Sequence, residues 1–243
     1  MPPERLPRGA AGPLLAVLLL TCACRSLPPV PPRAASLAPG AFVDASDVPT
    51  QRLFRLRYSG REGDVDLRLT LRWASPSHFR LTAADAAGRT RWDLFVAGET
   101  SIWIDPERPR PCRVASDRRA LDHALTLGLP VRDVAAVLAG KLPSPPASGS
   151  IAADGRFEFH DEEGRRWTGD TRGGSPLRWT LWDDGRPQVW LALDRGGFVL
   201  SAPLAGAQLH WRLIAREPLA DPASAAPPSD LFSAEECGDA RNP

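Results

Sequence analysis

The sequence predicts an α+β fold that is mostly β, with about eleven antiparallel strands and two short helices. Three observations carry this prediction. Apolar and polar residues alternate in short segments across residues 51–217, and a period of two is typical of strands with one buried face. Turns rich in Asp and Gly separate the segments. Between residues 116 and 140 the apolar spacing changes to that of helices.

The predicted strands fall into two groups. The clearest alternation runs over residues 65–73, and a second segment covers 54–58. Residues 59–63 between them form a Ser- and Gly-containing turn, so the two segments are expected to pair as a hairpin. The first group continues with 78–82, 92–96 and 101–105. The second group comprises 156–160, 166–171, 177–182, 188–193, 197–201 and 208–214.

Two short helices are expected between the two groups of strands. Ser116 can cap a first helix over residues 116–128, which carries Leu121, Ala124 and Leu125. Pro130 suits the first turn of a second helix that ends at Gly140. The apolar residues of this second helix are Val131, Val134, Ala135 and Leu138.

The first 23 residues have the order of a secretory signal peptide. Arg5 and Arg8 precede an apolar segment over residues 14–20, which is far shorter than the ~20 residues that span a bilayer. A cysteine just after the cleavage point resembles the acylation site of bacterial lipoproteins. Cys24 follows Ala and fits this site better than Cys22, which follows Thr. We therefore expect a lipid anchor at Cys24; an ordinary signal peptide with incidental cysteines is the alternative.

The remaining chain divides by composition. Residues 24–50 are rich in proline and are expected to form a stiff tether behind the acylated cysteine. Residues 51–217 form the folded domain, and residues 218–243, rich in Pro, Ala and Asp, are expected to be a disordered tail. Arg25 follows Cys24, where some bacteria place the Asp that retains lipoproteins at the inner membrane. We therefore expect attachment to the outer membrane, facing the periplasm.

Charge and motifs exclude several function classes. Removal of residues 1–23 leaves a formally neutral chain, which argues against a nucleic-acid partner. The sequence contains no catalytic, phosphate-binding or dinucleotide-binding motif, so we expect no enzyme activity, no cofactor and no metal.

His160, although followed by Asp161, is interpreted as a strand end at an exposed turn. Whether Cys112 and Cys237 form a disulfide stays open.

Three stretches, together with the order of the elements and the N-terminal cysteine, resemble the LolA/LolB-like family of bacterial outer-membrane lipoproteins. The first runs through residues 78–82, 85–89 and 92–94 and is similar to a family strand, turn and strand. The second, 129–143, is similar to the lid helix and the turn after it, and the third, 209–214, to the final strand. The resemblance implies an incomplete antiparallel β-barrel whose concave face is covered by the helices.

The family resemblance also implies a function in lipid handling. Acyl chains or lipoproteins would bind in an apolar cavity, and the protein would aid lipoprotein localisation. The alternative is a structural or assembly lipoprotein that docks an envelope partner. The family's membrane-facing turn matches Ala86 and Ala87, where this chain lacks the family's protruding Leu. The residues expected to line the cavity are Phe54, Leu56, Val65, Leu67, Leu69, Leu71, Trp73, Trp92, Leu94, Val134, Leu138, Trp179, Leu181, Leu209, Trp211 and Leu213.

Overall fold

The computed structural model describes residues 35–36, 48–61, 63–107, 110–114, 121, 125, 127, 129–141, 147–172, 175–194 and 197–237. All of them belong to one compact unit, Ala34–Pro243. The expected signal peptide (1–23), Cys22, Cys24 and most of the expected tether lie outside the described residues. None of the described helices is long and apolar enough to cross a bilayer.

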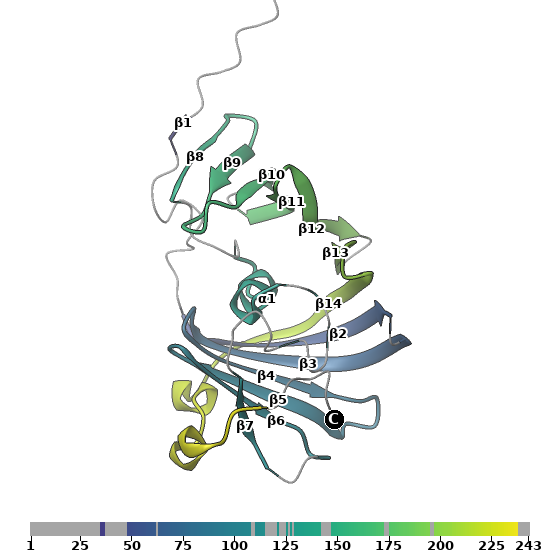
Figure 1. Ribbon diagram of the computed structural model, residues 1–243, viewed down its shortest axis with the longest axis vertical. Helices are drawn as coiled ribbons and strands as arrows, with labels where there is room; N and C mark the ends of the chain where they lie inside the picture. The colour runs from purple at the N-terminus through teal and green to yellow at the C-terminus, as the bar shows by residue number, and fades with distance from the viewer. Residues whose placement is uncertain are drawn as a thin grey trace, which may run out of the picture. The chain divides into compact units, whose positions relative to one another are not determined.

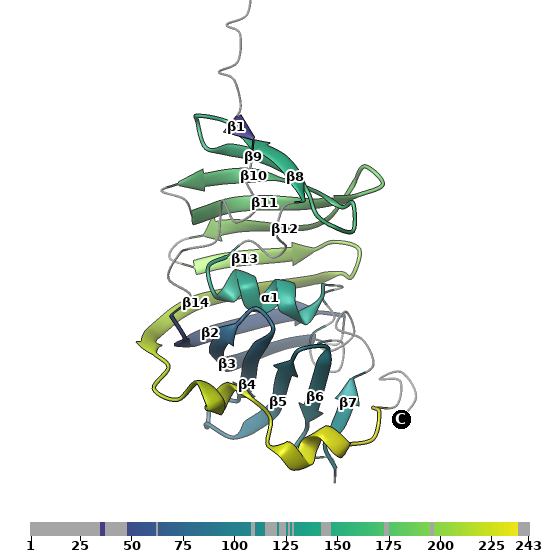
Figure 2. The same cartoon turned by 90° about the vertical axis from the view of Figure 1, so that its left-hand side faces the viewer.

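Fourteen strands form one sheet in the order β1-β8-β9-β10-β11-β12-β13-β14-β2-β3-β4-β5-β6-β7 (Figures 1 and 2). Every neighbouring pair is antiparallel. The strands are β1 (Ala35–Ser36), β2 (Thr50–Gly60), β3 (Gly63–Ser75), β4 (His78–Ala84), β5 (Thr90–Ala97), β6 (Thr100–Ile104), β7 (Cys112–Val114), β8 (Ser148–Ile151), β9 (Arg156–His160), β10 (Arg166–Arg172), β11 (Ser175–Asp183), β12 (Arg186–Asp194), β13 (Gly197–Ala202) and β14 (Ala207–Pro218).

The pairing of β14 with β2 joins the two halves of the sheet. The last long strand lies beside the first long strand, with Trp211 opposite Leu56. Within each half, β2–β7 and β8–β14, consecutive strands pair as antiparallel neighbours, and α1 (Val131–Leu138) lies between the two halves in the sequence. The edges are β1 and β7, which do not pair with each other, so the sheet is open.

The strand count expected from the sequence was wrong in part. Ten of the eleven predicted segments lie within an observed strand, and the segment 101–105 extends one residue past the end of β6; the sheet also contains β1, β7 and β8. These three strands have two, three and four residues. Such short segments show no readable alternation, and pairing with a neighbouring strand defines them instead. One of them, β1, lies within the expected tether and pairs with β8.

The helix α1 (Val131–Leu138) forms where the second helix was predicted. It lies over one face of the sheet (Figures 1 and 2), and Val131, Val134 and Leu138 join the core cluster of inward-facing strand residues. Of the first predicted helix, 116–128, only Leu121, Leu125 and Leu127 are among the described residues, and all three are buried. The prediction of that helix otherwise falls outside the described residues.

The segment after β14 differs from the disordered tail expected from residue 218. It forms two short 3-10 helices, η2 (Pro222–Ala225) and η3 (Ser229–Ser233), and η2 packs against β3 and β4. A disulfide joins Cys112 of β7 to Cys237. Figure 2 shows this segment running from the end of β14 past β4 and β5 to β7. Its composition lacks a periodic apolar pattern, so only these long-range contacts reveal its order.

Candidate functional site

The predicted cavity residues lie mainly in the core beneath α1. Fourteen of the sixteen are at most 6% exposed and belong to one cluster with the apolar residues of α1. The alternating pattern therefore placed these side chains in the interior, where they pack against one another in this structure. They are Phe54, Leu56, Leu67, Leu69, Leu71, Trp73, Trp92, Leu94, Val134, Leu138, Trp179, Leu181, Leu209 and Trp211.

Val65 and Leu213 are exceptions, because they are 44% and 46% exposed. Val65 lies near the tip of the β2–β3 hairpin, where residues 63–66 are all exposed. Leu213 directly precedes a register shift in the pairing of β14 with β2. A bulge of this kind bends the strand and disrupts its pairing locally, so Leu213 is exposed although it is paired with the buried Phe54. We therefore remove both residues from the proposed apolar interior.

Two adjacent residues in the first turn of α1 connect it to opposite halves of the sheet. Arg132 donates a hydrogen bond to the carbonyl oxygen of Gly98 in the β5–β6 turn and lies 3.4 Å from Glu99 Oε1. Asp133, which is 4% exposed, lies 3.5 Å from Arg165 Nη2 in the β9–β10 turn. These polar contacts hold the start of α1 between the two halves.

Arg165 is itself held by the buried carboxylate of Asp161. Arg165 Nε donates to Asp161 Oδ2 at 2.7 Å, and Trp167 Nε1 donates to the same oxygen at 2.9 Å. Burial by itself would raise the pKa of Asp161, but the hydrogen bonds from Trp167 and Arg165 and the positive charge of Arg165 lower that pKa below its ordinary value. Burial by itself would lower the pKa of Arg165. The hydrogen bond to Asp161 and the negative charges of Asp133, Asp161 and Glu163 outweigh this effect and raise that pKa above its ordinary value.

The other end of α1 is surrounded by basic side chains. Arg52 Nη1 donates to the carbonyl oxygen of Leu138 at 3.3 Å, and Lys141 Nζ lies 5.5 Å from the centre of the Trp73 ring. Cations at a helix C-terminus interact favourably with its exposed carbonyl groups. A cavity of about 30 Å³ lies here, lined by Val48, Thr50, Arg52, Trp73, Ala139, Gly140, Lys141 and Arg216.

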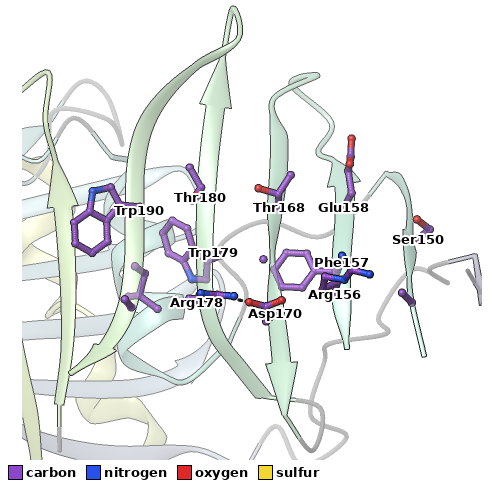
Figure 3. Close-up of a pocket in the computed structure, with 14 residues that line it drawn as sticks. Ser150, Arg156, Phe157, Glu158, Thr168, Asp170, Arg178, Trp179, Thr180 and Trp190 are labelled. Atoms are coloured by element: carbon purple, nitrogen blue, oxygen red, sulfur yellow. Dashed lines mark hydrogen bonds and ion pairs between the residues drawn. The ribbon is translucent and has the colours of Figure 1, made fainter. Parts of the chain in front are cut away.

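A groove of about 660 Å³ crosses β8–β12 on the face opposite α1. Cross-strand pairing aligns one wall, formed by Ser150, Glu158, Thr168, Thr180 and Trp190. The second wall is formed by Ala152, Arg156, Asp170, Arg178 and Ala192. Between the walls, the side chains of Phe157, Trp179 and Leu191 point into the core, so their backbone forms the floor. Figure 3 shows the labelled residues of both walls.

The charged groups of this groove are paired with one another or with neighbours. Arg178 forms an ion pair with Asp170, and Arg156 Nε lies 2.8 Å from Asp154 Oδ2. Glu158 pairs with Arg166 at 3.2 Å. Trp190, 36% exposed, lies at one end. Paired charges beside an exposed indole suit a polar chain or a protein segment better than a free ion. Of the predicted cavity residues, only Trp179 lines this groove.

The turn that contains Ala86 and Ala87 is built around Asp85. Asp85 Oδ1 accepts hydrogen bonds from the backbone N–H groups of Ala87 and Arg89, at 2.9 and 3.0 Å. Gly88, with a φ of 82°, closes the turn. Residues 161–165 repeat this arrangement with Asp161, Gly164 and Arg165. Ala86 and Ala87 are exposed at the tip of the turn, and a membrane-facing role for them remains a proposal.

Known structures share this architecture. A LolA superfamily protein from Nitrosomonas europaea aligns with a TM-score of 0.55 and 10% identity over 79% of this chain and 96% of that chain. The chain has a LolA-like fold. A DUF1329 family protein from Desulfovibrio piger aligns with a TM-score of 0.53 and 10% identity over 77% of this chain and 92% of that chain. No protein-family model and no curated protein matches the sequence.

The LolA-like fold places together several residues that sequence reasoning missed. Arg132, Asp133 and Arg165 were not singled out, because their meeting depends on two turns and a helix that are distant in sequence. The repeated Asp-x-x-Gly-Arg pattern at 85–89 and 161–165 is a signal by which sequence reasoning could have found Arg165. No group of three or more His, Cys, Asp or Glu side chains within the described ranges could hold a metal ion.

Proposed function

We propose that this protein is an exported envelope lipoprotein whose LolA-like domain binds acyl chains of lipids or lipoproteins on the apolar face beneath α1. The observation that carries the proposal is the surface of twelve buried strand residues, which α1 covers with Val134 and Leu138. Cys24, or with less support Cys22, would carry the lipid anchor at the periplasmic face of the outer membrane. We propose further that this binding serves the transfer of lipoproteins.

Binding requires that an acyl chain replace α1 on the sheet. Because the inward face of α1 is apolar, this exchange leaves the apolar strand residues out of water in both states. Burial of an acyl chain contributes about 0.8 kcal/mol per methylene, so a chain of ~14 methylenes contributes roughly 11 kcal/mol before the cost of moving α1. The polar contacts of Arg132 and Asp133 are the specific contacts that must break.

Quenching of tryptophan fluorescence by brominated fatty acids tests acyl binding directly. Trp73, Trp92, Trp179 and Trp211 all lie in the core beneath α1, so a bound bromoacyl chain would quench them by contact. We expect saturable quenching below the micellar concentration, reversed by an unbrominated fatty acid. The absence of quenching, together with a bare polypeptide in native mass spectra of gently extracted protein, would contradict the proposal.

The anchor is tested separately by metabolic labelling with palmitate. We expect labelling of the wild-type chain and of Cys22→Ser, and none of Cys24→Ser. Labelling of Cys24→Ser but not of Cys22→Ser would instead identify Cys22 as the acylated residue. If none of the three proteins is labelled, residues 1–23 are an ordinary signal peptide without a lipid anchor. This result does not depend on whether the interior binds acyl chains.

A second function, docking of an envelope protein, is favoured by the groove across β8–β12. This groove is open on the outer face and holds the exposed Trp190. We expect Trp190→Ala with Thr180→Arg to release a partner complex from membranes while bromoacyl quenching stays unchanged. Arg61→Gln, at a residue that does not line the groove, is the control. An unchanged complex in the groove variant would count against docking there.

A further inference from the structure

Three arginines lie side by side across the centre of the outer face. Arg212 of β14 is paired with Arg55 of β2, and Arg55 is paired with Arg68 of β3. All three side chains are exposed. They share a face because their neighbours Trp211, Leu56 and Leu67 point into the core on the other side. The next residue in the row, on β4, is Ala84.

This arginine row has no acidic partner within the described part of the chain. The structure shows no ion pair or side-chain hydrogen bond for Arg55, Arg68 or Arg212 among those residues. The adjacent row contains His210, Arg57 and Asp66, and Arg57 pairs with Asp64 at 3.3 Å. Like charges directly opposite on neighbouring strands destabilise a sheet. An external anion would relieve this repulsion.

An exposed aliphatic side chain lies next to the row. Ile214 lies two residues after Arg212 and is 51% exposed, whereas Leu213 is paired with the buried Phe54 and lies on the opposite face. The register shift between Leu213 and Ala215 leaves Ile214 without a cross-strand partner, which is how a bulge presents a side chain at a surface. Basic side chains beside aliphatic ones match the border between anionic headgroups and acyl chains of a bilayer.

We infer that the arginine row, with Ile214, is a docking surface for an anionic phospholipid membrane. Guanidinium groups form paired hydrogen bonds with phosphate oxygens, which suits Arg better than Lys for this contact. Adjacent strands lie ~4.8 Å apart, so three neighbouring arginines can contact neighbouring headgroups. Docking by this face leaves α1, on the opposite face, free to move. The inference does not depend on acyl binding beneath α1.

Vesicle cosedimentation tests this surface with the full chain carrying Cys22→Ser and Cys24→Ser, so that no acyl anchor contributes. Vesicles of phosphatidylcholine with 30% phosphatidylglycerol are compared with pure phosphatidylcholine. We expect stronger binding to the anionic vesicles, decreasing at high salt. Arg55→Gln, Arg68→Gln and Arg212→Gln together are expected to weaken that binding roughly a hundredfold, or about fivefold per arginine.

Two control variants separate docking from folding and from general charge. Arg156→Gln with Arg178→Gln removes two positive charges from the same face, but at residues paired with Asp154 and Asp170; we expect binding to change less than threefold. Replacement of the three row arginines by Lys keeps the charge and is expected to retain most of the binding. The inference would be overturned if the Gln triple variant bound the anionic vesicles as strongly as the Arg156/Arg178 control does. It would also be overturned if the chain with the intact row bound neutral and anionic vesicles equally.

Discussion

Arg165 of the β9–β10 turn lies 3.5 Å from Asp133 of α1, while Arg132, the preceding residue of α1, contacts the β5–β6 turn. The two halves of the sheet are thus joined through consecutive residues of one short helix. Any movement of α1 away from the concave face must break both contacts.

We expect Asp133→Asn to speed the uptake of brominated fatty acids several-fold, because it removes the ion pair that holds α1 to the β9–β10 turn. Arg165 keeps its bond to Asp161, so the free energy of unfolding should fall by only about 1 kcal/mol. Stopped-flow tryptophan quenching measures the rate. Glu163→Gln, which removes an exposed partner of Arg165, is the matched control and should leave the rate unchanged.

Asp161 is predicted to make the protein sensitive to acid. Its pKa is lowered in the folded state, so the stability it contributes is present above the unfolded pKa of about 3.9 and is lost as pH falls through the lower folded pKa. Asp161→Asn should cost about 2–3 kcal/mol near neutral pH and flatten the decrease below pH 4. Urea unfolding between pH 2 and 7 measures both effects; an unchanged acid slope would contradict the assignment.

The disulfide between Cys112 and Cys237 is predicted to hold the C-terminal segment in place. The two cysteines are 125 residues apart, so the bond restricts a long loop of the unfolded chain, and its loss should cost about 2–4 kcal/mol. Cys112→Ser with Cys237→Ser should also expose residues 218–237 to limited proteolysis. Cys22→Ser serves as the control. If residues 218–237 are cleaved equally in the double variant and in this control, the segment is held in place without the disulfide.

Gly169 is predicted to tolerate no side chain. A Cβ at this position would lie 2.3 Å from the carbonyl oxygen of Arg178 and 2.6 Å from the ring of Phe157. We expect Gly169→Ala to lower the free energy of unfolding by about 1–3 kcal/mol, because β10 and β11 must separate. Thr168→Ala, at the adjacent position on β10, should cost less. Thermal unfolding compares the two variants.

Arg55→Glu is predicted to stabilise the fold while it weakens membrane docking. A carboxylate between Arg212 and Arg68 replaces repulsion by attraction, a change of roughly 0.5–1 kcal/mol at low salt. Chemical unfolding at low and high salt measures this gain, which should vanish at high salt. A loss of stability would show that Arg55 has a structural partner and would remove the repulsion argument for the row.

Much of the fold could be predicted from local pattern. A period of two marks a strand with one buried face, which located eleven strands, and Pro130 with Gly140 bounded α1. The strands β1, β7 and β8 could not be predicted, because they are too short to show alternation and are defined by pairing with a neighbouring strand. The segment after Pro218 could not be predicted, because its order comes from contacts with distant residues. Alternation also gives the same pattern for an open cavity and for a filled core.

The sequence by itself determined most of the residues that form the interior, with Val65 and Leu213 as exceptions, since side chains alternate between the two faces of a strand. It also determined the neutral charge of the chain after the expected signal peptide, and the cysteines available for an anchor. Only the tertiary structure decided that the concave face is packed beneath α1, that Asp133 meets Arg165, and that three arginines lie in one row. Each of these depends on strand register and on contacts between distant segments, which local spacing does not encode.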